Sequence, residues 1–129
     1  MLLGELEKQV LQYLWETDQA DAKQVHAYFK KSRGGSLNTI QSTLDRLFRK
    51  GLLRREKQGH AFQYTAAVAR QVFIGQLIKD ITTDFSAADE NPLLAAFTSM
   101  SSEFNEDQLE ELERLIDARR AKTQLDKQS

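Results

Sequence analysis

The sequence predicts a mainly α fold with a small β-hairpin in its first half and further helices in its second half. Three observations lead to this prediction. Apolar residues recur every three or four positions in residues 5–16, 22–31 and 36–50, which is the spacing of one helix face. Between residues 52 and 65 the pattern alternates around a glycine turn, as it does in a two-stranded hairpin. From residue 67 the helical spacing returns.

Two short helices are expected first. The helix over residues 5–16 ends near Trp15, which continues its apolar stripe and is interpreted as a core or edge anchor rather than a binding platform. The helix over residues 22–31 begins with a capping box, in which Asp21 and Gln24 satisfy each other's backbone N–H groups. Its buried face is expected to consist of Val25, Tyr28 and Phe29.

The third helix, expected over residues 36–50, has two different faces. Ser36 is a strong N-cap and Gly51 ends the helix. One face is apolar and contains Leu37, Ile40, Leu44, Leu47 and Phe48. The opposite face with its edges contains Asn38, Thr39, Ser42, Asp45, Arg46 and Arg49. Short polar side chains and arginines read base edges and phosphates in a DNA major groove, whereas ordinary solvent faces are richer in Glu and Lys.

A hairpin is expected directly after this helix, with a tight turn at Gly59 and with Phe62 and Tyr64 on one face. Three short helices followed by such a hairpin make a winged helix-turn-helix. In that arrangement the third helix enters the major groove, and the wing, here residues 53–65, lies along the backbone or minor groove. The candidate phosphate contacts of the wing are Arg54, Arg55, Lys57 and His60. His60 is equally well explained as a passive turn residue.

The charge of the chain is unevenly distributed although its net value is only −1. Residues 1–66 carry 11 Lys and Arg against 7 Asp and Glu, whereas residues 67–129 carry 7 against 12. This asymmetry indicates a first half that binds a polyanion and a second half that avoids it. Taken alone, a solvated charged face explains the basic half equally well.

Residues 67–129 are expected to form a helical dimerisation region behind a DNA-binding domain at residues 1–66. Helices are predicted over residues 67–83, after the cap Asn91 and after the cap Asn105, with a linker at 84–90 and a frayed polar tail from residue 121. Three modest amphipathic helices favour two copies sharing one core over a monomeric cap on the winged helix. The candidate dimerisation residues are Phe73, Leu77, Ile81, Leu93, Leu94, Phe97, Leu109, Leu112 and Ile116.

Other classes of function are disfavoured. The chain has no cysteine, which excludes thiolate metal sites and thiol nucleophiles, and it has no apolar run of membrane-spanning length. His26 lies among polar positions, as an exposed surface histidine would, and His60 lies on a separate element. Without a Gly-rich phosphate loop or a nucleophile elbow, we expect neither an enzyme nor a cofactor. We expect a soluble, cytoplasmic protein.

Four segments carry a family resemblance: LGELEKQVLQYLW, QVHAYF, SLNTIQSTLDRLFRKGLL and GHAFQYTA. They resemble the penicillinase-repressor (BlaI/MecI-like) family of winged-helix transcriptional repressors and their CopY-type copper-responsive relatives. The resemblance covers residues 3–66 in sequence and 67–120 by helix pattern. It implies a homodimer whose C-terminal helices dimerise and whose two heads bind a palindromic operator in double-stranded DNA. By position, it implies that the major groove is faced by Asn38, Thr39, Ser42, Arg46 and Arg49.

The chain departs from this family at three places. His60 stands where members often carry arginine, so the wing contact is either pH-sensitive or absent. Copper-responsive members end in a cysteine cluster, which this chain lacks, so copper sensing by that route is excluded. Antibiotic-responsive members are cut by a protease at an Asn-Phe bond, and the nearest counterpart here joins Ala96 to Phe97. The resemblance thus implies a sensor protease as a partner, and the missing asparagine leaves this open.

The leading hypothesis is a homodimeric repressor that binds a palindromic operator through residues 36–50 and the wing. The alternative is a winged-helix protein-interaction module without sequence-specific DNA binding. Such a module should carry apolar or acidic residues on the outer face of its third helix. The Asn, Ser and two Arg found there favour DNA.

Overall fold

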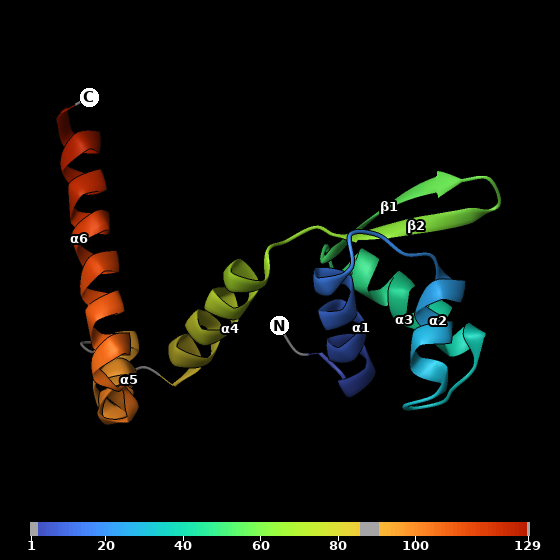
Figure 1. Cartoon of the computed structure of the whole chain (residues 1–129), viewed down its shortest axis with the longest axis horizontal. Helices are drawn as coiled ribbons and strands as arrows, with labels where there is room; N and C mark the ends of the chain where they lie inside the picture. Colours follow the sequence, from blue (N-terminus) through green and yellow to red (C-terminus); the bar gives the residue numbers. More distant parts are fainter. Residues whose placement is uncertain (1–2, 86–90, 129) are drawn as a thin grey trace. The chain divides into compact units, whose positions relative to one another are not determined.

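A computed structural model describes residues 3–85 and 91–128. Its elements are α1 (Glu5–Glu16), α2 (Ala22–Lys30), α3 (Leu37–Arg49), β1 (Leu53–Gln58), β2 (Ala61–Ala66), α4 (Arg70–Asp84), α5 (Pro92–Met100), η1 (Ser101–Glu103) and α6 (Glu106–Gln128) (Figure 1). The predicted fold class is confirmed: three helices, a hairpin wing and C-terminal helices. The chain forms two compact units, the first ending at Asp80 and the second beginning at Ile81. The functional division at residue 66 stays a prediction.

The core of the first unit is built from the inner faces of α1, α2 and α3. Its fully buried side chains are Val10, Leu11, Val25, Ile40, Thr43, Leu44 and Leu47. Thr43 is the polar member, and its hydroxyl donates to the Thr39 carbonyl oxygen at 2.8 Å, so its burial leaves no donor unpaired. The inner face of α3 is therefore fixed along the helix while its outer face stays in solvent.

The hairpin pairs β1 with β2 in an antiparallel register that runs from Leu53 opposite Ala66 to Gln58 opposite Ala61. Gly59 closes the turn with a φ of 65°, a conformation that glycine adopts without strain. Ala20, in the connection between α1 and α2, pairs with Tyr64 through two backbone hydrogen bonds of 2.8 and 3.1 Å. This bridge gives the wing a third strand position, which matters because a two-stranded hairpin is only marginally stable alone.

Trp15 lies half-buried at the edge of the core of the first unit, in agreement with its interpretation as a core or edge anchor, and it contacts the segment that leads into α4. The indole Nε1–H donates to the Val68 carbonyl oxygen at 2.9 Å, and the ring lies 5.7 Å from the ring of Phe73. The helix begins at Arg70 rather than at the predicted residue 67. The reason is that the Ala67 N–H still donates to the Leu52 carbonyl oxygen, which keeps the chain extended there.

The second unit contains α5, η1 and α6, with caps where the sequence predicted them. The Asn91 side chain accepts from the Leu94 N–H at 3.3 Å, and Asn105 and Gln108 form a reciprocal capping box. The prediction of a frayed tail from residue 121 is wrong, because α6 continues to Gln128 and its last turns contain good helix formers. In the predicted linker, Asp84 ends α4 and Phe85 follows in a turn. Residues 86–90 lie outside the described part of the chain.

Two predictions for α2 are corrected. Tyr28 is 54% exposed rather than buried, because it stacks on Tyr13 at 4.3 Å on an outer surface of the first unit. His26 is half-buried rather than exposed, and its Nε2 lies 3.1 Å from the Gly35 carbonyl oxygen. His26 therefore tethers the loop that leads into α3. Among the described residues, no helix combines the length and apolar character needed to span a membrane.

Candidate nucleic-acid interface

The outer face of α3 presents the five side chains that the sequence assigned to the major groove. Asn38, Thr39, Ser42, Arg46 and Arg49 are all exposed. Thr39 takes part in the N-cap, since its N–H donates to Ser36 Oγ at 3.1 Å. The Arg46 Nη2 donates to Thr43 Oγ1 at 3.2 Å, which draws this guanidinium back along the helix. The side chain of Arg49 is 76% exposed.

Asp45, at the edge of this face, binds two arginines from different elements. Its Oδ2 lies 2.8 Å from Arg49 Nε on the same helix, and its Oδ1 lies 3.2 Å from Arg55 Nη1 on β1. Oδ1 thus accepts a hydrogen bond from Arg55, and Oδ2 forms an ion pair with Arg49. The negative charge of Asp45, which alone would repel a phosphate backbone, is balanced inside the protein.

The wing candidates lie on opposite faces of the hairpin. Neighbouring side chains of a strand point to opposite sides, so Arg55 and Lys57 share the face of Phe62 and Tyr64, whereas Arg54 lies on the other face. The Arg55 guanidinium lies 3.9 Å from the Phe48 ring centroid and 4.3 Å from that of Phe62. Arg55 is therefore packed between α3 and the wing, while the other cations of the wing extend into solvent.

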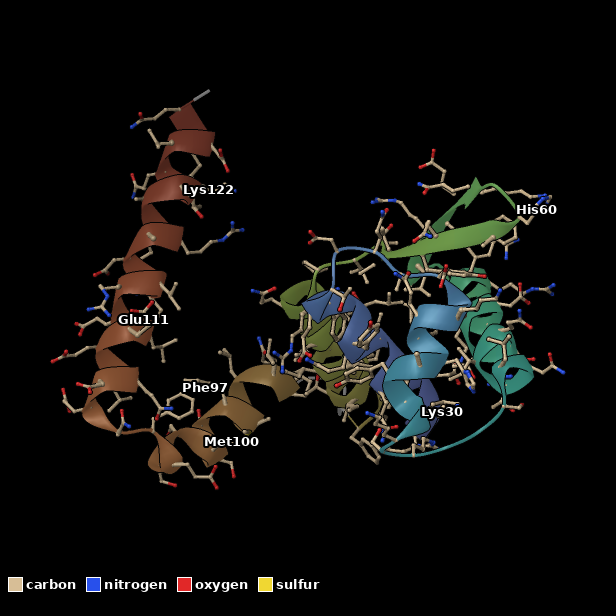
Figure 2. The ribbon with its side chains drawn as sticks, turned by 45° about the vertical axis from the view of Figure 1, so that its right-hand side comes forward. Lys30, His60, Phe97, Met100, Glu111 and Lys122 are labelled. Atoms are coloured by element: carbon tan, nitrogen blue, oxygen red, sulfur yellow. The ribbon has the colours of Figure 1, made fainter. Side chains whose placement is uncertain are left out.

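The tip of the wing carries His60, which is exposed (Figure 2). A hollow beside it is lined by Asp21, Lys23, Gln41 and Phe62, among others. Gln41 is exposed on the wing side of α3, and its amide is a further group able to contact a base edge. The sequence reasoning missed Gln41 because it lies beside the buried face in helical projection.

An ion pair between Glu7 of α1 and Lys50 at the C-cap of α3 holds the end of α3 against α1. Lys50 Nζ lies 2.7 Å from Glu7 Oε2, and the Gly4 N–H donates to Glu7 Oε1 at 3.2 Å. Burial by itself raises the pKa of Glu7, but the hydrogen bonds from Lys50 and Gly4 and the charges of Lys50 and Arg46 outweigh it, so the pKa is lowered. Glu7 is therefore ionised at neutral pH and joins the start of α1 to the end of α3.

The family model described as "Penicillinase repressor" matches residues 3–118, which is most of the chain. The chain belongs to the penicillinase-repressor family. Members of this family are winged-helix transcriptional repressors that bind DNA, not enzymes, and the resemblance inferred from the sequence is confirmed.

Similar members are known from several bacteria. The chain is 26% identical over 115 residues to the transcriptional regulator BlaI of Mycobacterium tuberculosis, covering 88% of this chain and 82% of that protein. It is 24% identical over 114 residues to the methicillin resistance regulatory protein MecI of Mammaliicoccus sciuri, covering 88% and 92%. Among solved structures, the DNA-binding domain of the repressor BlaI is 29% identical, with a TM-score of 0.49, and covers 53% of this chain and 83% of that domain.

The structure also contains ion pairs and a backbone bridge that were not predicted from the sequence. Asp45 and Arg49 are four residues apart on one helix, a spacing from which their pairing could have been predicted. The pairs formed by Glu7 with Lys50 and by Ala20 with Tyr64 join residues that are 43 and 44 positions apart, and no local pattern signals them.

Proposed function

We propose that the chain is a homodimeric repressor that binds a palindromic operator, with α3 in the major groove and the wing along the DNA backbone. The observation that carries this proposal is the outer face of α3. It is polar, bears two exposed arginines and lies next to the wing, and its inner face is fixed by packing and by the pair of Glu7 and Lys50. A helix held in place with exposed hydrogen-bonding groups is what direct readout of base edges requires.

The proposed DNA contacts divide by role. Asn38, Ser42 and Arg49 lie centrally on the outer face of α3 and are proposed to contact base edges, with Thr39 and Arg46 at its side. Proposed contacts to phosphates come from exposed polar side chains of the wing and its tip: Arg54, Lys57 and His60. Arg55 belongs to the same surface, but its packing between Phe48 and Phe62 gives it a supporting part.

The proposed second copy is supported by apolar surface that the described chain leaves uncovered. No described residue of α5, η1 or α6 is buried. Their large apolar side chains that are exposed are Leu93, Leu94, Phe97, Met100, Leu109, Leu115, Ile116 and Leu125. A helical unit without a core of its own needs a partner to exclude water from such faces, and a second copy brings a matching set.

The candidate dimerisation residues differ in where the structure places them. Phe73 is buried against Trp15, and Leu77 packs against the core of the first unit. Leu112 is half-buried, and Phe97 packs edge-on against Phe104 at 5.5 Å. Ile81 is exposed. The proposed dimer surface therefore rests chiefly on Ile81 and on the exposed side chains of α5 and α6.

The proposal includes a sensor protease as the partner that ends repression, on the strength of the family resemblance. The counterpart bond, between Ala96 and Phe97, lies within α5. Proteases bind their substrates as extended chains, so we expect cleavage there only after α5 has opened. Incubation with a candidate sensor protease from the source genome, followed by mass spectrometry of the fragments, tests whether this bond is cut.

Selection of bound fragments from the source genome, followed by gel-shift assays over a salt series, tests DNA binding. We expect a retained fragment with an inverted repeat and a log-log salt slope of about −0.9 for each phosphate neutralised. Retention of no fragment at low salt would contradict the proposal and favour a protein-interaction module instead.

A further inference from the structure

We propose that Asp45 determines specificity as a positioning residue. Held by the wing through Arg55, its carboxylate fixes the guanidinium of Arg49 for end-on recognition of a guanine in each operator half-site. This inference rests on the DNA-binding function proposed above. It assigns part of the sequence preference of DNA binding to one network, formed by Asp45, Arg49 and Arg55. Asp45 itself touches no base in this proposal and acts through Arg49.

The carboxylate of Asp45 is held at both of its oxygens. Oδ1 accepts from Arg55 Nη1 at 3.2 Å, and Oδ2 lies 2.8 Å from Arg49 Nε. The contact with Arg55 is a hydrogen bond between ionised partners, which is stronger than a neutral one, and the contact with Arg49 is an ion pair. The first contact crosses from β1 to α3, so the orientation of Asp45 depends on the wing being in place.

Arg55 is suited to be the fixed end of this network. Its guanidinium lies between the rings of Phe48 on α3 and Phe62 on β2, at 3.9 and 4.3 Å from their centroids. Only 26% of its side chain is exposed. A planar cation between two rings gains cation–π attraction on both faces and has little freedom to rotate. Arg55 therefore holds Asp45 instead of reaching out to a phosphate.

Arg49 is the mobile end that the network orders. Its side chain is 76% exposed, and the contact with Asp45 uses Nε. End-on recognition of guanine O6 and N7 uses the two terminal amino groups, which a contact at Nε leaves available. A free arginine loses rotamer entropy when it binds a base, and a side chain already tethered at Nε loses less. Asp45 thus prepares Arg49 for recognition before DNA arrives.

Asp45 could act in two ways, by positioning Arg49 or only by repelling phosphates, and an experiment can distinguish the two. A carboxylate on a DNA-binding surface opposes the attraction of every phosphate, whatever the base sequence. Its removal should therefore strengthen or preserve binding to random DNA. If Asp45 positions Arg49, the same removal should weaken discrimination at one base pair. The two effects have opposite signs, and each is measured separately.

The test uses the full chain and duplexes selected by the wild-type protein from a pool with a randomised core. In the selected sequence each guanine is replaced by adenine in turn, and the ratio of the two dissociation constants is measured at one salt concentration. We expect one position per half-site at which the wild-type ratio is about 5- to 150-fold, the range of a bidentate arginine–guanine contact. Arg49→Met should abolish the preference at that position.

Asp45→Asn should lower the ratio at the same position by at least about twofold, the lower end for contacting residues. Its affinity for random duplex should stay equal or rise. In the double variant Asp45→Asn, Arg49→Met the ratio should equal that of Arg49→Met alone. Arg54→Met, which removes a wing cation from the opposite hairpin face, is the matched control and should weaken all duplexes alike without changing the ratio.

An unchanged ratio in Asp45→Asn, or additive losses in the double variant, overturns the inference while leaving DNA binding intact. Retention of no duplex by the wild-type chain at low salt overturns the proposed function itself. Thermal melts establish that each variant is folded. Arg55→Met breaks the network from the wing side and should lower the same ratio, so the inference stays testable even with a poorly folded Asp45 variant.

Discussion

At the scale of single residues, Glu7 helps to hold α3, the proposed recognition helix, in place. It is charged and buried, which is costly without partners, and it has them in Lys50 and the Gly4 N–H. The pair joins the first turn of α1 to the C-cap of α3. An exposed glutamate in the same turn would stabilise α1 alone, whereas Glu7 also holds α3 against the first unit.

Glu7→Gln should therefore destabilise the chain by about 1.5–3 kcal/mol at neutral pH, the contribution of a hydrogen bond to a charged group. Because the pKa of Glu7 is lowered in the folded state, its contribution is complete above the unfolded value of about 4.3 and is lost as pH falls through the lowered value. Urea denaturation of both proteins over a pH series measures this, and the difference in unfolding free energy should shrink on acidification. Glu5→Gln, in the same first turn but exposed, is the control. Stability curves that stay parallel at acid pH would contradict the role of the pair.

Arg55 shows which contacts of a single residue can be predicted from the sequence and which cannot. A basic residue in a wing strand predicts a phosphate contact, and the sequence predicts this contact equally for Arg54 and Arg55, although the register places them on opposite faces. The sequence does not show that Phe48 and Phe62 enclose Arg55, because these rings come from two other elements. The direction of a long side chain depends on neighbours that only folding brings together.

At the scale of elements, the start of α3 is both a helix cap and part of the proposed DNA-binding surface. Ser36 Oγ accepts from the Thr39 N–H, and Asn38 and Thr39 lie in the first turn that this bond orders. The helix-turn-helix arrangement places the N-terminal residues of the recognition helix against base edges. Loss of the cap should therefore affect binding as well as stability.

Ser36→Ala should cost about 0.5–2 kcal/mol of stability, as removal of an N-cap does, and should weaken operator binding through fraying of the first turn. Ser36→Asp keeps an acceptor at the cap and should restore most of the stability. Ser32→Ala, at an exposed position before the glycine loop, is the matched control and should behave as wild type. Chemical denaturation and gel-shift titration measure the two effects. Equal stability of Ser36→Ala and wild type would show that the cap is dispensable.

The wing illustrates a dependence between elements that are distant in sequence. Its turn and alternation predict the hairpin, but the hairpin also needs the bridge from Ala20 and the burial of Tyr64. The segment before α2 reads as a polar connection, since a single bridging residue leaves no periodic signal. Strand pairing over such a separation is set by the packing of α1 and α2 rather than by local propensity.

At the scale of the whole molecule, the two units differ in how they are stabilised. The first has a continuous core from α1 to Phe73, whereas the described helices of the second have no buried residue. A unit of the second kind buries too little apolar surface to offset its conformational entropy. Its stability should therefore depend on association and on protein concentration.

Leu94→Glu places a charge on the exposed apolar side of α5 and should convert a dimer into a monomer, because an unpaired charge is costly in an apolar interface. Sedimentation velocity over a concentration series measures the oligomeric state of the variant. Operator affinity should fall with it, since two linked heads bind far more tightly than one. Lys122→Glu, at an exposed polar position of α6, is the control and should stay dimeric. Sedimentation of the wild-type chain as a monomer at all concentrations would contradict the proposed dimer.

The sequence by itself determined the helices, the wing, the caps at Asp21, Ser36 and Asn105, and the family, because periodicity and capping depend on residues within a few positions of each other. The tertiary structure alone decided that Glu7 holds α3, that Ala20 extends the wing and that Arg55 binds Asp45 between two rings. The physical reason is that charge pairing, bridging and ring packing act between residues that folding brings together from separate elements.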